Sequence, residues 1–230
     1  MRMLVSVRDV AEALAAAEAG ADFIDLKDPS AGALGALGPA RIGPIVAALR
    51  AAHRALPISA TIGDLPMADI DAVLQGVAEV AACGVDYVKV GVESGAQTLL
   101  AALAGCGAPV VPVLLADAGV DMVLVEAALA LDAFPALMLD TVDKRAGSLV
   151  ARADLTDLFD FVTTLQRQGR LAGLAGALRL ADVPALRAIA PDFAGFRSAV
   201  CDGPRDGVLD GARVRALRER LSPRPAPRGT

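Results

Sequence analysis

The chain of 230 residues has few cysteines and a single histidine, and both scarcities narrow the chemistry open to it. Cys83, Cys106 and Cys201 are odd in number and lack CxxC spacing, which argues against a disulfide framework and a zinc site. We expect three small buried thiols in a reducing cytoplasm. His53 should lie on the surface near the end of a helix, so lysine and carboxylate side chains must carry any proton transfer.

Long apolar runs and excess positive charge are also missing. Charged residues or glycine interrupt every apolar stretch before the roughly eighteen residues of a membrane span, and the N-terminal MRMLVSVRDV is too short for a signal peptide. A net charge of −5 argues against a nucleic-acid surface. We therefore expect a cytoplasmic protein with neither membrane nor nucleic acid as a partner, and the sequence leaves open whether it forms a homo-oligomer.

Aromatic residues make up only 3% of the chain although 55% of it is hydrophobic, so a large core must be built from Ala, Val, Leu and Ile. Short β-branched runs alternate with Ala-rich helical stretches throughout. We expect strands at residues 2–6, 22–27, 57–62, 86–91, 109–115, 135–140, 170–174 and 192–196, with helices at 8–19, 39–54, 68–83, 95–106, 118–132, 154–168, 182–189 and 206–221.

Eight strands, each followed by a helix through a short connection, predict an α/β fold, a single (β/α)8 TIM barrel over residues 1–221. Weak repetition supports this, because AGADFIDLK and CGVDYVKVG share a glycine that ends a helix and an aspartate that starts a strand, and APDFAGF echoes the strand part. The proline-rich stretch 222–230 is expected to be a disordered tail.

Lysine is the scarcest charged residue, with three copies against nineteen arginines. Lys27, Lys89 and Lys144 all fall at the carboxyl end of an expected strand or in the loop after it, where such barrels hold their active sites. Arginine stays protonated, whereas a buried lysine can lose its proton and act as a nucleophile or base. The pattern indicates that these three positions need lysine chemistry.

Side chains alternate between the two faces of a strand, so Asp25 and Lys27 should point into the barrel together, as should Tyr87 and Lys89. Asp140 ends the sixth strand, and Lys144 lies in the loop after it. Crowded cations lower one another's pKa, which supplies a neutral amine. The alternative is an inward ring of ion pairs that only fills the barrel, although buried charges are costly.

The loops after strands seven and eight, residues 173–178 and 196–200, contain small residues whose backbone N–H groups could close on an anion. The candidate phosphate-binding residues are Gly173, Ala175, Gly176, Arg197 and Ser198. The alternative is that glycine serves only the tight turns there.

Ser59 and Thr61 alternate along the third strand and are further candidates for substrate binding, as inward hydrogen-bond donors, or else polar fillers of the barrel. Asp64 follows in the loop. The glycine-rich segment 28–38, directly after Lys27, is either a lid or a mobile turn.

Several of these segments, SATIGDLP, DYVKVG, LDTVDK, GLAGAL and FRSAVC, together resemble the (5-formylfuran-3-yl)methyl phosphate synthase family, also called 4-(hydroxymethyl)-2-furancarboxaldehyde-phosphate synthase. The similarity runs from Leu4 to about Cys201. It implies a lyase that condenses two molecules of glyceraldehyde 3-phosphate into the furan phosphate, with loss of phosphate and water, for methanofuran-type cofactors. It further implies Lys27 as the Schiff-base lysine, Lys89 as proton acceptor, and Asp25, Asp140 and Lys144 as supporting acid–base groups.

Two features depart from the family pattern. Ala177 stands in the phosphate-type loop where a hydroxyl residue would be unsurprising, and the segment 222–230 has no evident counterpart. We expect no metal and no cofactor, because no cluster with ligand spacing is visible. Two other interpretations remain, a different Schiff-base aldolase acting on a sugar phosphate and a non-catalytic barrel that binds a phosphorylated metabolite.

Overall fold

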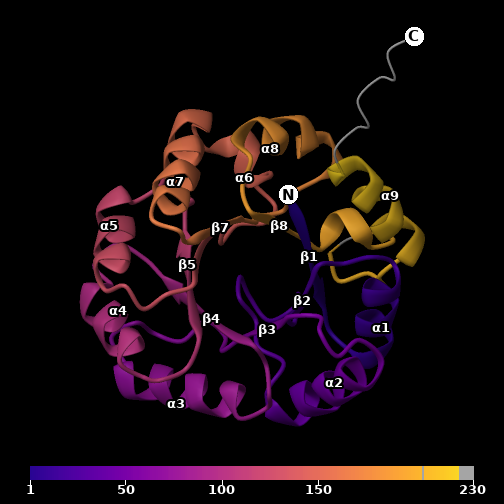
Figure 1. Ribbon diagram of the computed structural model, residues 1–230, viewed down its shortest axis with the longest axis horizontal. Helices are drawn as coiled ribbons and strands as arrows, with labels where there is room; N and C mark the ends of the chain where they lie inside the picture. Colours follow the sequence, from indigo (N-terminus) through magenta and orange to yellow (C-terminus); the bar gives the residue numbers. More distant parts are fainter. Residues whose placement is uncertain (204, 223–230) are drawn as a thin grey trace.

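The computed structural model describes residues 1–203 and 205–222 and contains a closed barrel of eight parallel strands in the order β1 to β8. Each strand pairs with its neighbours in the sequence, and β8 pairs with β1 to close the sheet. Figure 1 looks down the barrel, with the helices forming a ring around the strands. The predicted TIM barrel is confirmed.

The strands begin and end within about two residues of the expected bounds. They are β1 (Arg2–Val7), β2 (Phe23–Leu26), β3 (Ile58–Thr61), β4 (Tyr87–Val92), β5 (Val110–Leu115), β6 (Ala136–Asp140), β7 (Leu171–Leu174) and β8 (Phe193–Phe196). The chief helices are α1 (Val10–Glu18), α2 (Pro39–Ala52), α3 (Ile70–Ala81), α4 (Gln97–Ala104), α5 (Met122–Ala130), α7 (Leu155–Arg167), α8 (Val183–Ile189) and α9 (Gly211–Leu221).

Short helical turns in the upper loops were not predicted. They are α6 (Leu149–Arg152) and the 3₁₀ turns η1 (Leu180–Asp182) and η2 (Ser198–Val200). The last helix was also wrongly placed: α9 begins at Gly211 rather than at residue 206, because the Asp210 carboxylate caps it by accepting the Ala212 N–H. The expected tail, apart from Ser222, lies outside the described residues.

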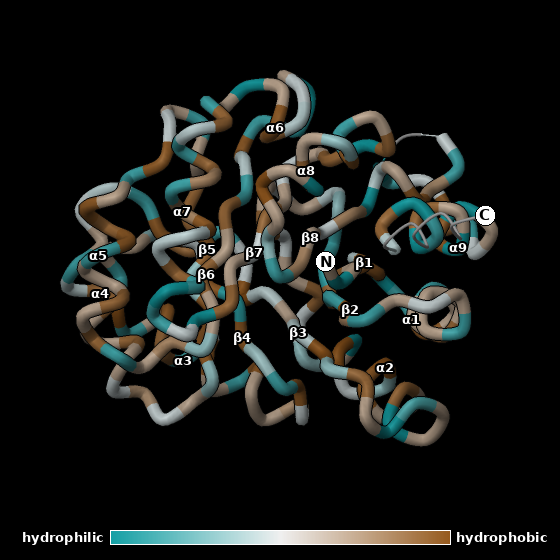
Figure 2. The backbone as a smooth tube through the Cα atoms, turned by 45° about the horizontal axis from the view of Figure 1, so that its top comes forward, coloured by the Kyte–Doolittle hydropathy of each residue, from teal (hydrophilic) through white to brown (hydrophobic). Residues whose placement is uncertain are grey.

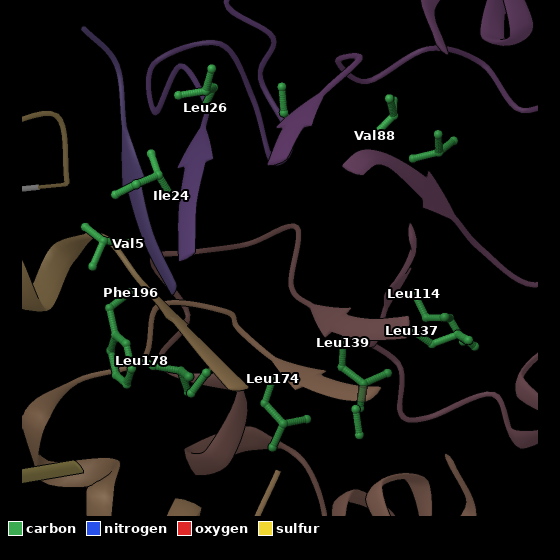
Figure 3. Packing of buried hydrophobic residues seen from close by; sticks show 14 of the residues in the cluster. Val5, Ile24, Leu26, Val88, Leu114, Leu137, Leu139, Leu174, Leu178 and Phe196 are labelled. Carbon is green, nitrogen blue, oxygen red and sulfur yellow. The ribbon is translucent and has the colours of Figure 1, made fainter. Parts of the chain in front are cut away.

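The main hydrophobic core lies between the barrel and the helices. It consists of strand side chains that point outward, such as Val5, Ile24 and Leu26, packed against the apolar faces of the helices. Figure 3 shows part of this packing, and Figure 2 shows hydrophobic and hydrophilic residues alternating along the surrounding helices. Because Ile24 and Leu26 face outward, the residues between and beside them face the barrel interior, as predicted.

The repeated aspartates do the same structural work in three places. Asp22, Asp86 and Asp192 each precede a strand, and each donates its backbone N–H to the carbonyl of one residue in the preceding strand while its carboxylate accepts that residue's N–H. The partners are Met3, Ile58 and Ala172. The sequence repeat therefore fixes the register of three strand pairs at the bottom of the barrel.

The cysteines are only partly as expected. Cys201 is buried, but Cys83 and Cys106 are half-buried, because they lie at the ends of surface helices rather than in the core. His53 ends α2 and is partly exposed, as predicted. Within residues 1–203 and 205–222, no helix is both long enough and apolar enough to cross a membrane.

Candidate active site

One cluster of polar side chains is centred on Asp25, which points into the barrel from β2. Ser6, Asp25 and Ser59 are register partners across β1, β2 and β3, so both hydroxyls reach the same carboxylate, at 2.9 and 2.8 Å. The Lys89 Nζ lies 2.6 Å from Asp25 Oδ1. Two hydroxyls and the Lys89 amine thus hold a carboxyl group that is only 1% exposed.

A second cluster is centred on Asp140, the last residue of β6. The Lys27 Nζ lies 3.4 Å from Asp140 Oδ2, and Lys144 forms an ion pair with Oδ1 from the loop that follows the strand. The Thr141 backbone N–H also donates to Oδ1, at 2.8 Å. The structure therefore brings together all five residues predicted to be catalytic, at the carboxyl end of the barrel.

Burial and the neighbouring charges change the proton affinity of these groups. Burial, reinforced by the charge of Lys27, lowers the pKa of Lys89, although Asp25 and Asp140 act against this. Burial likewise lowers the pKa of Lys144 to about 8. For Asp140, burial alone would raise the pKa, but the charges of Lys27 and Lys144 outweigh it and hold the pKa at about 2.

A pocket that is open to solvent lies above the two clusters. Its walls come from the ends of β1, β2, β4 and β6 and from the loops after β7 and β8, and they include Ala175, Gly176, Arg197 and Ser198. Among the described residues, the backbone N–H groups of Gly176, Ala177 and Leu178 have no backbone acceptor. They are available to an anion in the pocket.

The two arginines at the pocket have different surroundings. The buried Arg197 guanidinium forms an ion pair with Glu12 of α1 and donates to the carbonyl oxygens of Ser6 and Gly207, so its charge is already matched. Arg205, in the loop between η2 and α9, lines the pocket near Asp140 and Lys144. With every lysine protonated, the three lysines and Arg205 outnumber the two carboxylates, and each lysine that loses its proton reduces this positive charge by one.

Three predicted binding residues do not line this pocket. Thr61 is fully buried and donates to the Gly35 carbonyl at 3.0 Å, while the Ser59 hydroxyl is bonded to Asp25. Gly173 lies lower in the barrel, where a Cβ would fall 2.2 Å from the Phe193 ring. Their assignment to substrate binding stays a prediction.

Three residues of the site were not predicted from the sequence: Arg205, Ser6 and Glu12. Arg205 lies in an irregular loop with no periodicity, so nothing in the pattern gives its direction. The inward parity of β1 could have identified Ser6, because Leu4 and Ser6 share the interior face with Asp25.

Comparison with known proteins gives the family of the chain. A family model described as 4-HFC-P synthase matches residues 3–218, which is nearly the whole described barrel. The chain belongs to the 4-HFC-P synthase family. A Methylorubrum extorquens protein provisionally named (5-formylfuran-3-yl)methyl phosphate synthase is 42% identical over 93% of this chain and 88% of its own. The synthase of that name from Methanopyrus kandleri is 34% identical over 96% of this chain and 99% of its own.

Solved structures resemble this 4-HFC-P synthase family member in fold. Phosphoribosyl anthranilate isomerase from Thermus thermophilus superposes with a TM-score of 0.68 at 19% identity, covering 96% of this chain and 98% of that one. A 3-hexulose-6-phosphate synthase gives 0.59 at 18% identity, with 96% and 100% covered. The family is named for the synthesis of the furan phosphate, and the chain is accordingly an enzyme.

Proposed function

We propose that this enzyme condenses two molecules of glyceraldehyde 3-phosphate into (5-formylfuran-3-yl)methyl phosphate, with loss of phosphate and water, through a Schiff base on Lys27. The observation that carries the proposal is the convergence of three buried or largely buried amines on two carboxylates at one mouth of the barrel. The product would supply the furan ring of a methanofuran-type cofactor.

Lys27 is assigned as the nucleophile because it opens into the pocket and, among the described residues, contacts a single carboxylate, at 3.4 Å. Attack of its neutral amine on the substrate carbonyl gives an iminium, which acidifies the adjacent C–H bond. Removal of that proton gives an enamine, which adds to the second aldehyde. Elimination of phosphate and water then leads to the furan, and hydrolysis of the lysine imine takes up the water lost when the iminium formed, releasing the furan aldehyde and the free Lys27 amine.

Lys89 is assigned as the proton acceptor. Its amine is 4% exposed and is held 2.6 Å from Asp25, and its lowered pKa favours the neutral form that a base requires. Asp25 orients that amine. Asp140 and Lys144 support the protonation changes at Lys27. Asp140 forms an ion pair with Lys27, and Lys144 forms an ion pair with the other oxygen of Asp140.

The phosphate groups of the substrates are assigned to the wall formed by Ala175, Gly176 and Ser198, with Arg205 and Lys144 supplying charge. The unbonded N–H groups of residues 176–178 support this assignment, as does the guanidinium of Arg205 in the pocket wall. Ser59, Thr61, Gly173 and Arg197 remain the other candidates for substrate binding. The hydroxyls of Ser59 and Thr61 also hold Asp25 and the segment after β2, and Arg197 is paired with Glu12.

Incubation with glyceraldehyde 3-phosphate alone, followed by mass spectrometry and near-ultraviolet absorbance, tests the reaction. A furan aldehyde absorbs in that range and a simple aldol product does not, so the spectrum separates the proposal from another Schiff-base aldolase acting on a sugar phosphate. Borohydride trapping separates both from a barrel that only binds a phosphorylated metabolite, since binding leaves no covalent mark on lysine. Absence of a furan product with the folded enzyme would overturn the proposal.

A further inference from the structure

The segment after β2, residues 28–38, folds back into the mouth of the barrel. Its Leu34 side chain is 1% exposed and belongs to the interior cluster that also contains Val111 and Val113 of β5, apart from the main core between strands and helices. The neighbouring Leu37 points the other way, into that main core. Of the two leucines in this segment, only Leu34 is therefore inserted into the barrel interior.

The Asp64 carboxylate, in the loop after β3, holds this segment at two points. Oδ2 accepts the Ala33 N–H at 2.9 Å and Oδ1 accepts the Leu34 N–H at 3.1 Å. At Gly32, φ is +99° and a Cβ would fall 2.1 Å from Asp64 Oδ2, so only glycine lets the carboxylate approach. The Thr61 hydroxyl adds a bond to the Gly35 carbonyl.

Leu34 lies one layer above Lys89, on the side of the mouth. Tyr87, Lys89 and Gly91 alternate along the inward face of β4, and Lys89 and Gly91 are level with Val111 and Val113 of β5. A Cβ at Gly91 would meet Leu34 Cδ1 at 2.8 Å, so the missing side chain leaves the space that Leu34 fills. The leucine thus occupies the interior position between the Lys89 layer and the loops above.

We propose that Asp64 and Leu34 are positioning residues, which together form a latched apolar cap over the β4–β5 side of Lys89. The cap limits the water around that amine to what enters from the pocket, and so favours the neutral form that acts as a base. The inference rests on the proposed role of Lys89. The cap works through exclusion of water, since an ammonium loses hydration when apolar groups cover it and a neutral amine loses much less.

Other groups facing Lys89 act in known directions. Asp25 at 2.6 Å and Asp140 favour the ammonium form, and Lys27 disfavours it. Tyr87 shares the strand, Ser59 and Thr61 of β3 carry no charge, and β5 contributes Val111 and Val113. Lys144 forms an ion pair with Asp140 rather than with Asp25. None of these is altered by replacing Leu34.

The scarcity of lysine makes a direct test practical. Protein labelled with 13C at the lysine Cε should give three sets of NMR signals, which can be assigned with Lys→Arg variants. Each set can be followed in a pH titration without substrate. Leu34→Ala should move the titration midpoint of Lys89 upward, because water then reaches the amine. Leu37→Ala, a leucine of the same segment that faces the outer core, should leave the midpoint of Lys89 where it was.

Asp64→Asn is a second variant, and its two effects on the pKa of Lys89 have opposite signs. Loss of a negative charge alone would lower the pKa of a nearby amine, whereas release of the cap raises it. We expect an upward shift, and Asp69→Asn, which removes a carboxylate that caps α3 by accepting the Ala72 N–H, should give none. Leu34→Met restores apolar bulk and should restore the midpoint.

Kinetics give the matching signature. If the neutral Lys89 amine is the base, the rising limb of kcat against pH moves to higher pH in Leu34→Ala and Asp64→Asn, with a loss of about tenfold or more near neutral pH and little change in KM. An unmoved Lys89 midpoint in folded Leu34→Ala and Asp64→Asn overturns the cap. Failure of the wild-type enzyme to form the furan overturns the proposed function instead, because the titration needs no substrate.

Discussion

The two ends of the barrel interior are built from the same strands but carry opposite kinds of side chain. At the amino end, Phe23 of β2 packs against Phe193 of β8 with ring centroids 5.6 Å apart, within an apolar cluster. Two residues further along β2 comes Asp25, and two further still Lys27, at the other end of the same inward row. Residues on the same inward face therefore serve packing at one end of the strand and carry the charged groups of the site at the other end.

The outward-facing residues of these strands do not change from apolar to charged along the strand. Ile24 and Leu26 alternate with the residues above and are fully buried against the helices from one end to the other. The barrel wall therefore stays aliphatic along its length, while only the inward row changes from aromatic to charged. This division predicts that substitutions at one end of the interior leave the property of the other end nearly intact.

The largest expected effect is the loss of all chemistry in Lys27→Arg. Arginine keeps the charge but cannot shed its proton to attack a carbonyl, so turnover and borohydride trapping with substrate should both disappear. The midpoint of chemical denaturation should stay close to that of the wild type, because the amino end and the outer core are untouched. Substantial remaining activity, or trapping that maps to Lys89, would show that the assignment of roles is wrong.

The Lys89→Arg variant should be equally inactive in turnover but should differ in trapping. The base acts after the iminium has formed, so Lys27 can still bind the substrate covalently. Borohydride reduction followed by peptide mapping should find the adduct on Lys27. A variant that neither turns over nor traps would place the Lys89 requirement before the iminium and contradict the proposed order of steps.

At the opposite end, Phe193→Ala should lower stability without removing the chemistry. The ring is 6% exposed and packs against Phe23 and over Gly173, so its loss leaves a cavity that costs about 3 kcal/mol of unfolding free energy. Denaturant titration measures this, and kcat per folded molecule should remain within about twofold. Phe159→Ala, at an exposed position of α7, is the matched control and should cost far less.

The sequence predicted the barrel and its charged mouth because both depend on local, periodic signals. Alternation along β2 and β4 is enough to put Asp25, Lys27 and Lys89 on the inward face, and the glycine–aspartate repeats mark where strands begin. Parity also sends Phe23 and Tyr87 inward at the amino end. These are properties of a single strand and need no knowledge of its neighbours.

Contacts between segments distant in the chain could not be predicted. Ser59 and Thr61 point inward as expected, but their partners, Asp25 and the Gly35 carbonyl, come from other segments. The direction of Leu34 depends on Asp64, thirty residues later. Arg205 reaches the pocket from a loop without periodicity. Loop conformations of this kind are set by tertiary contacts, for which a single sequence carries no direct signal.

The smallest effect is expected for Lys144→Arg, and it should depend on pH. Near pH 7, about a unit below its pKa of about 8, Lys144 is roughly nine-tenths protonated, so arginine supplies nearly the same charge to Asp140 and to bound phosphate. We therefore expect a change in the dissociation constant of inorganic phosphate of less than about threefold at that pH.

The difference should appear as pH rises through the pKa of Lys144. Lys144 loses its charge above pH 8, so the affinity of the wild-type enzyme for phosphate should fall between pH 7 and 9. The arginine variant keeps its charge and should bind phosphate more tightly than the wild type at pH 9. Calorimetric titration of both proteins at the two pH values measures this crossover. Lys27→Arg is the matched control for the charge of the mouth, since it also places a permanent cation there, but at the end of β2 rather than in the loop after β6. Parallel loss of affinity in the wild type and in Lys144→Arg would contradict the expectation, because some other group would then govern the titration of the phosphate site.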